Sequence, residues 1–126
     1  MASGPKLDGP GTVKIVTLEE SLVMLQGVHS LVERMGMEVK SGKPIGGMMQ
    51  QFKRIATPLV GKLKAQFQLI SDLIAGMLQI AGRSGPDALK LRMFREGVAQ
   101  ARTQLEIAIT QTKEKHLVKD GEAKTG

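Results

Sequence analysis

The sequence predicts an all-α protein, an antiparallel three-helix bundle built on a long helical hairpin. The first observation is an apolar side chain every three or four residues from Met49 to Ala81, which is the spacing of one helix face. A second apolar stripe with the same spacing runs from Leu91 to Thr112. The third observation is the turn at residues 83–86 between the stripes, which is short enough to make the two helices antiparallel.

The first helix is expected over residues 18–40. Residues 12–16 alternate apolar and polar side chains and include β-branched residues, so they are expected to form a short extended segment or strand before it. Thr17 is the expected N-cap residue, and Glu20 can complete a capping box. Gly42 and Pro44 supply the signal that ends the helix.

The second helix is expected over residues 45–82, with a kink at Pro58. Proline has no N–H to donate to the carbonyl of Arg54, and its ring clashes there. However, the apolar stripe keeps its phase through Pro58. A loop usually resets that phase, so the pattern favours one kinked helix over two separate ones. The third helix is expected over residues 86–118.

Length and composition indicate a single domain. The chain has 126 residues, which is enough for one domain of ordinary size. The beginning is rich in glycine and proline and the end is polar, so we expect a flexible arm at residues 1–11, a bundle domain at 12–118 and a flexible tail at 119–126. Aromatic residues make up only 2% of the chain, so the core is expected to be aliphatic.

The unequal lengths of the expected helices predict self-association. A short first helix covers only part of the hairpin and leaves an apolar strip open, which another copy of the chain, the N-terminal arm or a different protein partner would bury. We therefore expect a non-catalytic scaffold, adaptor or structural subunit that binds itself and another protein. The residues expected to form the helix packing and oligomer interface are Leu59, Leu63, Phe67, Ile70, Leu73, Ile74, Leu91, Phe94, Val98 and Leu105.

The charge distribution supports an alternative function. The net charge is +6, and residues 39–71 contain no Asp or Glu. A stretch with cations only attracts anions, although a solvated helix face has the same pattern. The alternative is that the chain binds nucleic acid or another polyanion without base-specific readout, through Lys53, Arg54, Lys62 and Lys64.

No pattern of reactive residues indicates an enzyme. The chain contains no Cys and two His, His29 and His116, and neither has a metal-ligand pattern around it. No phosphate-binding loop is present, and the acidic residues lack partners at catalytic spacing. We therefore expect no catalytic residues, no cofactor and no metal. No continuous apolar run reaches the roughly 18 residues of a membrane span, so the expected location is the cytoplasm.

Overall fold

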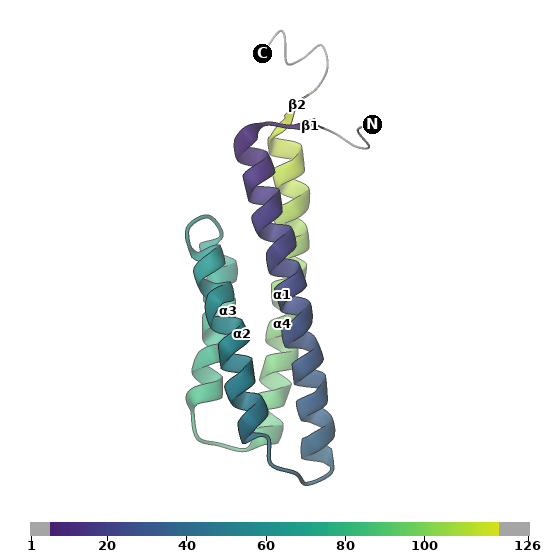
Figure 1. Cartoon of the computed structure of the whole chain (residues 1–126), viewed down its shortest axis with the longest axis vertical. Coiled ribbons are helices and arrows are strands. Elements are labelled where there is room, and N and C mark those ends of the chain that lie inside the picture. The colour runs from purple at the N-terminus through teal and green to yellow at the C-terminus, as the bar shows by residue number, and fades with distance from the viewer. Residues whose placement is uncertain (1–5, 119–126) are drawn as a thin grey trace.

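The computed structural model describes residues 6–118 and is almost entirely helical (Figure 1). Two strands of two residues each pair antiparallel, with Lys6 opposite Val118 and Leu7 opposite Leu117. The all-α class is confirmed, but the described chain has four helices, so the expected number of three is wrong. The elements in order are β1 (Lys6–Leu7), α1 (Gly9–Lys40), α2 (Gly46–Lys64), α3 (Gln68–Gly82), α4 (Asp87–Lys115) and β2 (Leu117–Val118).

The four helices form a ring in which each helix packs against two others. α1 packs against α4 and α2, and α3 packs against α2 and α4. α1 has 32 residues and α4 has 29, whereas α2 has 19 and α3 has 15. The bundle therefore has four helices at one end, while at the other end α1 and α4 continue alone past the turn between α2 and α3 (Figure 1). We call this second part the two-helix end.

The core runs along the centre of this ring and is aliphatic apart from one aromatic pair. Phe52 of α2 and Phe94 of α4 stack with their ring centroids 4.5 Å apart and an interplanar angle of 18°. Both side chains are fully buried. Since α2 and α4 lie diagonally across the ring, this stack connects the α2–α3 hairpin with the α1–α4 pair.

The first helix begins earlier than the sequence pattern predicts. Asp8 is the N-cap residue, and its side chain accepts a 2.7 Å hydrogen bond from the N–H of Gly11. Pro10 lies in the first turn, where the missing N–H costs nothing. The expected cap at Thr17 is therefore wrong, and residues 12–16 are helical rather than extended. The end is as predicted, because α1 stops at Lys40 and Gly42 follows with a φ of 73°.

The expected helix over residues 45–82 is two helices. The chain reverses between α2 and α3, where Phe67 has φ −134° and ψ 58°, outside the helical region. Pro58 lies inside α2 and does not end it. Pro58 and Arg54 are both exposed, so water can reach the carbonyl that the proline leaves without a donor. The reversal lets α2 pack against α1 and α3 pack against α4, while α2 and α3 also pack against each other.

The last predicted helix agrees with α4, which begins at Asp87 and ends at Lys115. Leu117 and Val118 then leave the helix and form β2. Residues 6–11, within the expected N-terminal arm, form β1, the N-cap and the first turn of α1. The rest of that arm, residues 1–5, and the expected tail at 119–126 lie outside the described residues.

Candidate functional site

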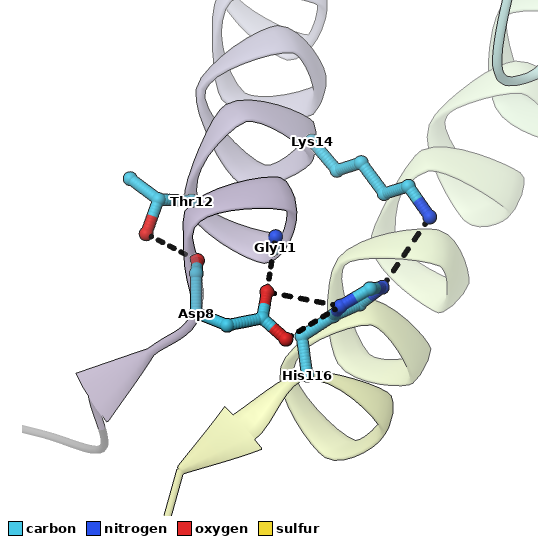
Figure 2. A network of polar contacts seen from close by, with 5 residues as sticks. All are labelled: Asp8, Gly11, Thr12, Lys14 and His116. Atoms are coloured by element: carbon cyan, nitrogen blue, oxygen red, sulfur yellow. Dashed lines mark hydrogen bonds and ion pairs between the residues drawn. The ribbon is translucent and has the colours of Figure 1, made fainter.

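A polar cluster joins the first turn of α1 to the end of α4 (Figure 2). Nδ1 of His116 lies 3.1 Å from each carboxylate oxygen of Asp8, and its Nε2 lies 3.3 Å from Nζ of Lys14. The backbone N–H of Asp8 also donates to the carbonyl of His116. Gly11 is buried against this histidine, and a Cβ there would collide with the Cβ of His116. The cluster therefore fixes the two ends of the described chain side by side.

The contacts of this cluster place the Asp8 carboxylate and the Lys14 ammonium at the two ring nitrogens of His116. A protonated Nδ1 donates to Asp8, and an Nε2 without a proton accepts from Lys14. The hydrogen bond from the Gly11 backbone N–H, with smaller contributions from His116 and Lys14, lowers the pKa of Asp8 below its ordinary value. The His116 side chain is 15% exposed and that of Asp8 is 43% exposed. The hydroxyl of Thr12 donates to the backbone carbonyl of Asp8 at 3.0 Å, so it is held by the backbone rather than by the histidine ring (Figure 2).

An open groove without charged residues lies between α3 and α4. It has a volume of about 370 Å³ and is lined by Leu69, Leu73, Ala99, Gln100, Thr103 and Gln104. Leu69 is 68% exposed although it is a large apolar residue. A single exposed apolar side chain is ordinary on a protein surface, but this one borders a groove that is lined mainly by apolar atoms.

A second depression continues the groove along α4 toward the two-helix end. It shares Thr103 with the first and is also lined by Glu106, Ile107, Thr110 and Gln111. Ile107 is 41% exposed, and Glu106 is the one charged residue in this lining. We call the residues that line these two depressions the α3–α4 face. The sequence pattern did not single out this face; the available signal was the group of small and uncharged polar residues at exposed positions of α4, among them Ala99, Gln100 and Thr103.

The four cations of the alternative hypothesis all lie on α2 but do not form one cluster. Lys62 pairs with Glu20 of α1 at 2.6 Å, so part of its charge is neutralised within the chain. Arg54 and Lys64 are exposed, and Lys53 is half-buried. With about 100° of rotation per residue, Lys53 and Lys64 lie toward one edge of the outer face of α2 and Lys62 toward the other.

The residues expected to form the helix packing and oligomer interface lie mostly inside one chain. All of them are buried except Phe67 and Leu73, which are half-buried, and Phe67 packs against the core. Leu73 also lines the groove of the α3–α4 face. These positions therefore mostly build the core of the bundle. Of the histidines, His29 lies half-buried on α1 and His116 belongs to the polar cluster.

Comparisons with protein-family models, with curated proteins and with solved structures found no match. Within residues 6–118, no three His, Asp or Glu side chains lie close enough together to hold a metal ion.

In the described part of the chain, α1 is the one helix long and apolar enough to cross a membrane, with a mean hydropathy of 1.2 over an 18-residue window. Only 39% of that window is buried in the bundle. Core helices of soluble proteins pass the same test, so length and hydropathy are weak support for a span.

The lowered pKa of Asp8 predicts a loss of stability in acid. The pKa of Asp8 is lower in the folded than in the unfolded chain. Its contribution to stability is therefore fully present at a pH above the pKa of the unfolded chain. It is lost as the pH falls below about 4 and through the pKa of the folded chain. Urea unfolding of wild type and Asp8→Asn from neutral to acid pH measures this. The free energy of unfolding should fall more steeply with acid in wild type than in the variant.

Asp72→Asn is the matched control, since it removes an exposed carboxylate from α3. It should keep the wild-type steepness. Equal acid dependence in wild type and Asp8→Asn would show that the cluster does not stabilise the fold.

Proposed function

We propose that this chain is a non-catalytic helical protein that associates with copies of itself and serves as a scaffold, adaptor or structural subunit. The observation that carries the proposal is the step where α1 and α4 continue past the α2–α3 hairpin (Figure 1). Apolar side chains stay in solvent along this part of both helices. Val13 is 59% exposed, Val16 is 47% exposed and Ile107 is 41% exposed.

Covering these side chains provides the driving force for association. Fully burying an exposed Val or Ile side chain contributes about 1.5–3 kcal/mol, and these side chains, which are about half exposed, would contribute about half of that each. Single exposed apolar residues are ordinary on protein surfaces, but here they accompany the exposed Leu69 and an uncharged groove.

Sedimentation velocity over a range from low to high micromolar concentration tests self-association. One chain has a mass of 13.6 kDa, and the proposal predicts a shift to at least twice this mass as concentration rises. The melting temperature should rise with concentration in parallel, because association stabilises the folded state by mass action. A compact species of single-chain mass throughout the range would contradict the proposal.

The basic residues of α2 support polyanion binding as a second candidate function. Arg54 and Lys64 are exposed, and no acidic residue lies on α2. Gel shifts with mixed-sequence duplex and single-stranded nucleic acid at low and moderate salt test it, because phosphate contacts make affinity fall steeply with salt. We expect salt-sensitive binding that Arg54→Ala together with Lys64→Ala weakens. Binding that is absent at low salt would rule this function out.

A further inference from the structure

We propose that the α3–α4 face is the surface on which a second copy of this chain docks, with the two α4 helices antiparallel across a two-fold axis near Thr103. This inference rests on the proposed self-association and assigns its surface and geometry. It follows from the charge, the shape and the hydrogen-bonding groups of this face.

The charge of the chain restricts where two copies can meet. Each copy carries a net charge of +6, so two copies repel each other, most strongly where cations face cations. A two-fold interface places the same patch of both copies together. On α2, this would bring Arg54 and Lys64 against their own counterparts. The groove between α3 and α4 contains no charged residue, so two copies can meet there without that repulsion.

The valines at the two-helix end are a less suitable surface for a second copy. Val13 and Val16 lie on α1 next to Lys14, and Glu19 and Glu20 follow in the next turn. An interface over these valines would have to cover or displace charged side chains, which costs solvation free energy. The α3–α4 face has apolar exposure at Leu69 and Ile107, and Glu106 is the one charged residue that lines it.

The shape of the α3–α4 face is complementary to itself. In an antiparallel helix pair, positions one turn before and one turn after the symmetry axis face each other. With the axis near Thr103, Ile107 of each copy lies opposite Ala99 of the other. Ala99 lines the groove beside Leu69 and Leu73. The exposed Ile107 side chain therefore enters the groove of the second copy, and the second copy's Ile107 enters this one.

The polar groups of the face also suit this pairing. The same register places Glu106 of one copy opposite Gln100 of the other. The amide of glutamine donates and accepts hydrogen bonds, so Gln100 can donate to that carboxylate. Gln104 lies close to the axis and faces the same region of the second copy. A charged ligand would find no opposite charge in the groove itself, which favours a second copy over an acidic peptide or nucleic acid at this place.

Disulfide cross-linking tests the position of the axis. The chain contains no Cys, so each single-cysteine variant carries one thiol. Thr103→Cys should form a disulfide-linked dimer readily under mild oxidation, because a two-fold axis brings the two Cα atoms within the about 4.4–6.8 Å that a disulfide requires. Gln51→Cys, exposed on α2, is the matched control. Equal or lower yield from Thr103→Cys than from Gln51→Cys would overturn the proposal.

Substitution of Ile107, the side chain that enters the groove of the second copy, gives a second, independent test through the dissociation constant of the dimer. By sedimentation velocity, Ile107→Asp should weaken self-association at least about tenfold in Kd, because it places a charge in the apolar groove of the second copy. Val23→Asp, at a 72% exposed position on α1, should keep the wild-type Kd. Circular dichroism verifies that both variants keep their helical fold; if Ile107→Asp does not, the cross-linking yields decide.

The outcomes separate this inference from the proposed function. If wild type stays monomeric at every concentration, the proposed self-association and this inference both fail. If wild type associates but Ile107→Asp has no effect, or only Val23→Asp weakens association, self-association stands and the assignment to the α3–α4 face is wrong.

Discussion

The antiparallel pairing of α1 with α4 is the contact on which the rest of the fold depends. These two helices are the longest in the described chain, and the polar cluster of Asp8, Lys14 and His116 aligns their ends. The shorter α2–α3 hairpin packs its apolar stripes against them. The stack of Phe52 on Phe94 joins this hairpin to the long pair at the centre of the bundle. Without the long pair, the stripes of α2 and α3 would have too little apolar surface to pack against.

The same pairing explains why the surface of the molecule is uneven. Since α1 and α4 exceed α2 and α3 in length, their apolar faces continue beyond the turn at residues 65–67. The exposed side chains of Val13, Val16 and Ile107 result from this difference in length. Of these side chains, Ile107 lines the α3–α4 face, whereas Val13 and Val16 lie beside Lys14 on α1. Charge placement therefore favours the α3–α4 face over the valines as the surface for a second copy.

The helical class, the turn at residues 83–86 and the core positions could be predicted from sequence because the three-to-four spacing of buried side chains is a local property of helices. The reversal at Phe67 could not be predicted this way. No glycine or proline marks it. In sequence, Ile70 follows Leu63 at the spacing of about two helical turns. The apolar pattern therefore keeps its phase across the three-residue turn. The early start of α1 was missed because residues 8–11 resemble coil, although an Asp before Pro10 is a helix-start signal. The α3–α4 face depends on which side chains the tertiary fold leaves exposed, so spacing alone did not reveal it.

The most direct test of the four-helix packing is the free energy of unfolding of Phe94→Ala, measured by urea denaturation. The control is Met93→Ala, which truncates the neighbouring side chain, 38% exposed. Phe94 is fully buried against Phe52, so its truncation should lower the free energy of unfolding by about 3–5 kcal/mol. Met93→Ala should change it by no more than about 0.5 kcal/mol. Equal small losses in both variants would contradict a core in which α2 and α4 meet across the centre of the bundle.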